Sequence, residues 1–188
     1  QWGELSLEFE VLGFERIPLP NDGESWKRSQ IKCLPSIARA AREKKLSLYS
    51  YCELRHESWK RSQNQGDLFK NIEINWVDAA IERSYFMQMD IGKYIETEKV
   101  IQFCEMILSP GVEELIDKAN TYLKLPSKMV KNLKNLERFR ELCKGLPKKM
   151  YPDIFHLWSA EVNGIEYFLT IDKKFISAMT ETKRIELP

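Results

Sequence analysis

The sequence of 188 residues predicts an α/β protein with a small, mostly parallel sheet flanked by helices and a helix-rich middle. Three observations support this fold class. Short apolar runs near both ends alternate with helical patterns, as expected when helices join parallel strands. The segment 166–171 is almost wholly apolar, which is typical of a strand buried on both faces. Between 78 and 144, apolar residues recur at helical spacing in four separate segments.

The N-terminal elements begin with a strict alternation of apolar and polar residues over 5–11, which indicates a half-buried strand. The prolines and the Asn-Asp-Gly cluster of 18–23 then predict a turn. A helix is expected over 25–45, and Pro35 should kink or interrupt it, because proline removes a helical hydrogen bond. A short strand at 46–51 completes this part.

Helices then follow one another along the chain. One should start near Glu53 or Glu57, and another is expected over 153–162, before the strand at 166–171. Glycine and proline residues mark the ends of the helices between them. These middle helices are predicted at 78–89, 96–108, 112–123 and 127–144.

The composition limits the class of protein. A net charge of +1 excludes a globally basic nucleic-acid binder, and no apolar stretch is long enough to span a bilayer. Four widely spaced cysteines without a secretory signal predict reduced thiols and a cytoplasmic location. Charge is nevertheless uneven, with nine Lys or Arg against two Glu over 124–149, a stretch that includes Lys131 and Lys134. This stretch is either a solvated helix face or a surface that follows RNA phosphates.

A seven-residue repeat, Glu-Ser-Trp-Lys-Arg-Ser-Gln, occurs at 24–30 and again at 57–63. Both copies are predicted to open a helix with a glutamate in its first turn. Tryptophan next to Lys and Arg also suits stacking on a nucleic acid, which makes Arg61 a candidate substrate-binding residue. Two similar helix starts with a half-buried tryptophan explain the repeat more simply.

Three acidic residues are expected at one edge of the sheet. Asp172 ends the predicted strand 166–171, Asp153 opens a helix, and Glu57 follows the strand 46–51. Ligands of open α/β sheets bind at the carboxyl ends of the strands, where these carboxylates would meet. Grouped carboxylates suit a hard cation, so the sequence predicts a site for Mg²⁺ or Mn²⁺.

The C-terminal stretch 153–175 resembles the signature of PIN-like domains, a family of metal-dependent ribonucleases that includes many toxins of toxin–antitoxin pairs. The stretch 36–61 is similar to the family's second motif. The resemblance implies a single PIN-like, Rossmann-like three-layer domain over 1–188, with a helical insertion at about 78–148.

The resemblance further implies that the chain hydrolyses RNA phosphodiester bonds. Glu57, Asp153 and Asp172 would then be catalytic residues and metal ligands, and the Thr170 hydroxyl would orient a ligand or substrate. The expected partners are RNA, an antitoxin-like protein and a second copy of the chain in a homodimer, with no membrane.

One family feature is missing, because no Asp-Thr-Asn-like motif follows the first predicted strand. Glu10 or Glu15 could replace it, or it could lie upstream of Gln1. If it is lost, the alternative function is a catalytically silent PIN-like scaffold that binds RNA or a protein. An unrelated α/β interaction domain is a third reading.

Simpler structural roles compete for each candidate residue. Asp153 and Asp172 could each cap a helix, and His156 could be a packed histidine. Glu57 could be an ordinary acid in a helix, with Glu53 taking the role in the site.

Overall fold

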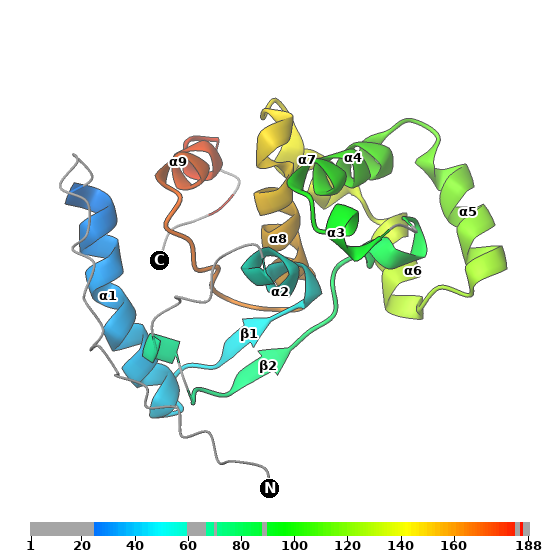
Figure 1. The fold of residues 1–188 in the computed structure, drawn as a ribbon. Coiled ribbons are helices and arrows are strands. Elements are labelled where there is room, and N and C mark those ends of the chain that lie inside the picture. Colours follow the sequence, from blue (N-terminus) through cyan, green and yellow to red (C-terminus); the bar gives the residue numbers. More distant parts are fainter. Residues whose placement is uncertain (1–24, 60–66, 70, 88–89, 183–184, 186–188) are drawn as a thin grey trace, which may run out of the picture.

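The computed structural model describes residues 25–59, 67–69, 71–87, 90–182 and 185. The predicted strand at 5–11, the turn at 18–23 and the candidates Glu10, Glu15 and Arg61 lie outside the described residues. Helices make up most of the described part, with a small parallel sheet beside them (Figure 1). None of these helices is both long and apolar enough to cross a lipid bilayer.

The first helix, α1 (Ser25–Arg42), agrees with the prediction but passes through Pro35 without ending. The first strand, β1 (Leu48–Ser50), is confirmed and shorter than expected, and α2 (Cys52–Trp59) follows it directly. The second copy of the repeat therefore ends a helix instead of opening one, whereas the first copy does open α1. The prediction for the second copy was wrong because α2 already begins five residues earlier, at Cys52.

The sheet pairs β1 with β2 (Ile74–Trp76), a strand that the sequence patterns did not predict. The two strands are parallel, with Leu48 opposite Ile74 and Ser50 opposite Trp76. A parallel pair needs a crossover connection, and here α2 and the 3₁₀ turn η1 (Asp67–Phe69) lie in it. The predicted small parallel sheet is thus present with two strands in the described residues, and a three-layer arrangement is not established by it.

The predicted buried strand at 166–171 is wrong. This segment has no strand pairing, and Tyr167 and Leu169 are 64% and 57% exposed. An apolar run indicates a buried strand only if a neighbouring strand exists to hydrogen-bond it, and none lies beside this one in the part of the chain that the structure describes. The segment instead connects α8 (Tyr151–Val162) to α9 (Lys173–Glu181).

The middle of the chain is helical, as predicted, with two exceptions. Its helices are α3 (Ile91–Tyr94), α4 (Thr97–Leu108), α5 (Val112–Leu123), α6 (Ser127–Lys134) and α7 (Glu137–Cys143). The helix expected over 127–144 is divided into α6 and α7 at Asn135, whose backbone leaves the helical region. Asparagine favours such ends because its side chain competes with helical hydrogen bonds.

The helix expected over 78–89 is also wrong, because the only helical turn described there is η2 (Arg83–Tyr85). Ala79, Ala80 and Ile81 are three consecutive buried residues, a pattern that one face of a helix does not produce. Side chains satisfy the backbone instead. The Ala80 N–H donates to Ser159 Oγ (3.2 Å), and Asn132 Nδ2 donates to the Ala80 carbonyl (2.8 Å).

The core lies around α8, which packs against α4, α7 and the 3₁₀ turn η3 (Lys148–Met150) (Figure 1). Phe155 of α8 is fully buried and meets Phe103 and Phe139 edge-on, with ring centroids 5.9 and 6.0 Å apart. Phe139 stacks on Trp158 at 4.9 Å. The helices of the predicted insertion therefore supply much of the core.

Candidate functional site

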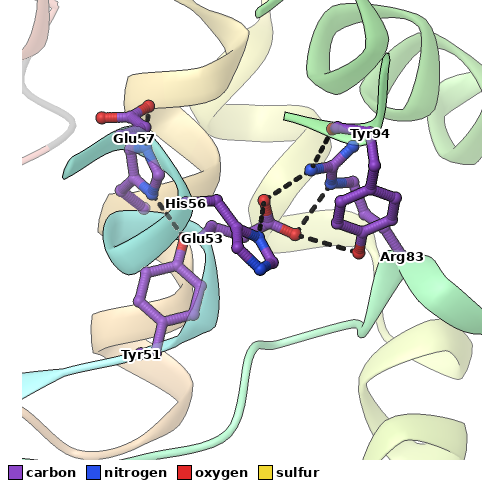
Figure 2. A network of polar contacts seen from close by, with 7 residues as sticks. Tyr51, Glu53, His56, Glu57, Arg83 and Tyr94 are labelled. Carbon is purple, nitrogen blue, oxygen red and sulfur yellow. Dashed lines mark hydrogen bonds and ion pairs between the residues drawn. The ribbon is translucent and has the colours of Figure 1, made fainter. Parts of the chain in front are cut away.

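Helix α2 presents polar side chains to two separate networks (Figure 2). Glu53, His56 and Glu57 are three and four residues apart, a spacing that places them near one face of a helix. Figure 2 shows Glu53 and His56 turned toward Arg83 and Tyr94, while Glu57 lies on the side of Tyr51. The sequence left open whether Glu53 or Glu57 belongs to the site, and the two glutamates lie in different networks.

The first network is a buried ion pair between Glu53 and Arg83. Arg83 Nε and Nη2 donate to the two carboxylate oxygens at 2.8 and 2.6 Å, and Nη2 also donates to the Tyr94 carbonyl at 3.1 Å. The Tyr94 ring lies 4.1 Å from the guanidinium carbon, within cation–π range. Because Arg83 is completely buried and Glu53 is almost so, Glu53 is committed to this pair, and Glu57 remains the candidate for the site.

The second network joins Glu57 to α8 through His156. His156 Nε2 lies 3.0 Å from Glu57 Oε1, and Nδ1 lies 2.5 Å from the Tyr51 hydroxyl. His156 and Tyr51 are buried, whereas the Glu57 side chain is 39% exposed, so this network leads from the core to an accessible carboxylate.

Asp153 lies in the first turn of α8, three residues before His156. Burial raises the pKa of the Asp153 carboxyl above its ordinary value, the neighbouring His156 lowers it, and the negative charges of Glu57 and Asp172 raise it further. Glu57 and Asp172 therefore both lie within electrostatic range of Asp153, although the three acids come from three different elements. His156 is a fourth member that the sequence did not assign to the site.

Asp172 has a structural function as the N-cap of α9. Its Oδ1 accepts hydrogen bonds from the backbone N–H groups of Lys174 (2.8 Å) and Phe175 (3.0 Å). The Thr170 hydroxyl accepts the N–H of Asp172 itself at 3.1 Å, which shapes the entry to the helix. Thr170 thus acts on Asp172, and its predicted contact with a ligand or substrate stays a prediction.

The predicted RNA-binding residues Lys131 and Lys134 are exposed on α6, away from the acids. Lys128 of the same helix donates to Asn163 at 2.6 Å, which places α6 at the C-terminal end of α8. Asp153 is at the other end, about 15 Å away at 1.5 Å per residue. The structure therefore does not bring these lysines to the acids.

Lysines closer to the acids stand at the start of α9, directly after Asp172. Lys173 and Lys174 are exposed, and Lys173 Nζ lies 6.0 Å from the centre of the Trp26 ring of α1. The sequence signal for them was present in the Asp-Lys-Lys run at 172–174. Trp26 belongs to the first copy of the repeat, whose position beside α9 no local pattern could have indicated.

A preformed metal cage is not found at this site. In the ranges that the structure describes, no three His, Cys, Asp or Glu side chains are arranged to hold a metal ion together. The donors therefore do not fit a zinc-like centre with all ligands from the protein. They fit the way Mg²⁺ binds through one or two carboxylates together with substrate phosphates.

The half-buried carboxyl of Asp153 leads to a test by pH. Asp153→Asn is expected to raise the free energy of unfolding at neutral pH, because asparagine brings no charge into this acidic, half-buried position. An acid whose pKa rises on folding stabilises the protein only while protonated, and this stability is lost as the pH rises through the folded pKa. The advantage of the variant should thus vanish below the ordinary aspartate value of 3.8.

Urea unfolding of both proteins over a series of pH values measures this difference. A variant that is less stable than the wild type at neutral pH would contradict the expectation and would show that Asp153 is stabilising as a charged helix-start residue.

Comparisons with known proteins add no relative. No family model matches the chain, and neither the curated proteins nor the solved structures contain a significant match. The identification as a PIN-like domain consequently stays a prediction, and the assignment of function depends on the site itself.

Proposed function

We propose that the chain is an endoribonuclease of PIN-like organisation that hydrolyses RNA phosphodiester bonds with Mg²⁺ or Mn²⁺. The observation that carries this proposal is that Glu57 is joined to α8 through His156, and that the charges of Glu57 and Asp172 both raise the pKa of Asp153. Carboxylates brought together in this way repel one another, and a cation with a phosphate group relieves that repulsion.

The cation, when bound with RNA, would polarise the phosphate and lower the pKa of an attacking water. Glu57 and Asp153 are the residues that would hold it. Asp153 would bind the cation through one carboxylate oxygen, and its second oxygen is suited to accept the proton of that water. The water oxygen then bonds to phosphorus, one bridging P–O bond breaks, and the leaving oxygen takes up a proton.

Positive charge for the RNA backbone stands next to the acids. Lys173 and Lys174 are exposed at the start of α9, immediately after Asp172, where they can contact phosphates on either side of the reacting one. Lys131 and Lys134 lie further along the molecule and would bind a distant part of a longer RNA. A toxin role with an antitoxin-like partner belongs to the proposal through the family resemblance alone.

The test is cleavage of labelled single-stranded RNA with Mn²⁺ and with EDTA. Asp153→Asn should reduce cleavage at least about a hundredfold, because it removes a proton-accepting group. Asp172→Asn should also reduce it, while asparagine keeps the N-cap of α9 as well as aspartate does. Asp117→Asn, an exposed acid on α5, is the matched control and should leave cleavage unchanged.

Cleavage that persists in EDTA, or in the Asp153→Asn variant, would overturn the proposal. The second candidate function is a scaffold that binds RNA without cutting it. It is favoured by the lack of a three-ligand group in the described chain and by the use of Asp172 as a cap. Retention of RNA in a gel shift without a metal and without cleavage products would support this scaffold. If the chain neither retains RNA nor forms cleavage products, a protein partner is indicated.

A further inference from the structure

Asn163 ends α8 and joins three parts of the chain through its side chain. Its Nδ2 donates to the backbone carbonyl of Asp78 at 2.9 Å and to that of Ser159, one turn back in α8, at 2.7 Å. Its Oδ1 accepts from Lys128 Nζ of α6 at 2.6 Å. The segment before η2, the end of α8 and the start of α6 therefore meet at one amide group, the Asn163 junction.

The partners of this amide fix its orientation. Backbone carbonyls only accept hydrogen bonds and a lysine ammonium only donates them, so the amide nitrogen must face the two carbonyls and the oxygen must face Lys128. Both hydrogens of the amide nitrogen are used. An aspartate at this position would set a carboxylate oxygen against the two carbonyls, and only the bond to Lys128 would survive. The junction therefore depends on the amide nitrogen.

The residue after Asn163 is a glycine, and this makes the amide chemically labile. Asn163-Gly164 is the only Asn-Gly pair in the sequence. Gly164 has a positive φ of 67°, a conformation that glycine adopts without strain at the end of a helix. Because glycine has no side chain, its backbone nitrogen can also approach the side chain of the asparagine before it.

The reaction open to such a pair is deamidation by water. The Gly164 nitrogen bonds to Asn163 Cγ, the Cγ–Nδ2 bond breaks, and the proton of the attacking nitrogen leaves with Nδ2 as ammonia. The product is a five-membered succinimide ring. Water then opens the ring at one of its two carbonyl carbons, which gives aspartate or isoaspartate. No oxidant or enzyme is needed.

The folded chain keeps this reaction from starting. The ring closes only when the Gly164 nitrogen is eclipsed with Asn163 Cβ. The ψ of Asn163 is 3°, so this nitrogen is eclipsed with the Asn163 backbone nitrogen instead and is turned away from the side chain. The Gly164 N–H also donates to the Glu161 carbonyl at 3.0 Å. Both the backbone and the amide must be released before the bond can form.

We propose that Asn163 is a deamidation site that the folded chain protects, and that it reacts only when the Asn163 junction opens. Opening is reversible, whereas the loss of ammonia is not. The product carboxylate cannot donate to the two carbonyls, and isoaspartate also lengthens the backbone by one atom. Each chain that has reacted therefore keeps a loosened junction. The inference does not rest on the proposed function, because it needs neither RNA nor a metal.

Peptide mapping of the full chain by mass spectrometry measures the reaction, with and without guanidinium chloride. In the denaturant, Asn163 should react well ahead of Asn135, the exposed asparagine that follows α6 and precedes a leucine. Without it, the rate at Asn163 should fall at least about tenfold, since the open form gives up three hydrogen bonds. Equal rates in both conditions, or no preference for Asn163 in the denaturant, would overturn the proposal.

Two matched lysine variants test the junction. Lys128→Met removes the donor to Asn163 Oδ1 and nearly keeps the length of the side chain, so deamidation of the folded chain should become about 2–10-fold faster. Lys131→Met is the same change at an exposed residue of the same helix and should leave the rate unchanged. In the denaturant, both variants should react as the wild type does. A wild-type rate in folded Lys128→Met would refute control by the junction.

Asn163→Asp carries the side chain of one product and tests whether the loosening persists. The backbone amides of Gly164 and Ile165, which donate to Glu161 and Ala160, should exchange their hydrogens about tenfold faster in this variant than in the wild type. Amides in the middle of α4 should be unaffected. Wild-type exchange at the end of α8 would show that the carboxylate does not loosen the junction. The rate measurements on the wild type do not depend on this variant.

Discussion

Replacing Glu53 by leucine is expected to lower the free energy of unfolding by about 3–5 kcal/mol, because it leaves the charge of Arg83 buried without its partner. Arg83 is completely buried, and its Nη1 has no hydrogen-bond partner even in the intact protein. No other side chain within the described residues replaces the two bonds that Glu53 accepts from it at 2.8 and 2.6 Å. Urea unfolding of the wild type and the variant measures the loss.

A double replacement shows the origin of this loss. Glu53→Leu combined with Arg83→Met removes both charges and should recover most of the stability, since apolar residues of similar volume often replace a buried pair at little cost. The exposed pair Glu137–Arg140 of α7 is the control, and Glu137→Gln should change stability by less than about 0.5 kcal/mol. A double variant as unstable as the single one would show that packing, and not charge, determines the loss.

The second large effect is expected in the aromatic core. Phe155→Ala should lower the free energy of unfolding by about 3–5 kcal/mol, because it removes a fully buried ring and leaves a cavity. The ring contacts Phe103 and Phe139 edge-on and lies 6.1 Å from the ring of Trp158, so its loss weakens the contacts of α8 with both α4 and α7. Chemical unfolding is again the measurement.

An exposed aromatic residue provides the comparison. Tyr122 on α5 is 82% exposed, and Tyr122→Ala should change stability by no more than about 0.5 kcal/mol. If Phe155→Ala proved as mild as Tyr122→Ala, the core would have to collapse around the missing ring. That outcome would contradict the tight aromatic packing around α8.

Helices with local signals at both ends could be predicted from the sequence. α5 was predicted with its observed bounds because a Ser-Pro-Gly sequence precedes it and Gly111 adopts a positive φ of 79° before its first turn. α4 and α8 were predicted to within two residues at each end. All the information these predictions need lies within one or two turns of the element, so distant contacts do not alter them.

The failures occurred where a distant partner decides the structure. The run 166–171 has the composition of a buried strand, yet no strand pairs with it, and Tyr167 is exposed. Conversely, the short and exposed β2 was missed, because its pairing with β1 is fixed by the crossover and not by its own residues. The segment 78–89 has helical spacing, but contacts from α6 and α8 replace its helical hydrogen bonds.

The candidate site was predicted in part for the same reason. The acids Glu57, Asp153 and Asp172 were chosen for their places at the ends of predicted elements, and their role in a site stays a prediction, although the charges of Glu57 and Asp172 both raise the pKa of Asp153. The partners of Glu57 and Glu53 could not be predicted. His156 is 99 residues from Glu57 in the sequence, and Arg83 is 30 residues from Glu53.

The buried segment of Ala79, Ala80 and Ile81 has a consequence for engineering. A designer who looks for a permissive connection would choose such a stretch without regular structure to insert a tag or to join new termini. Here the chain is held from two sides by Asn132 and Ser159, and its residues belong to the core. An insertion would separate these anchors and break their hydrogen bonds to the Ala80 backbone. The turn at Gly111, which is exposed between two well-formed helices, is the position where the chain can be opened or extended.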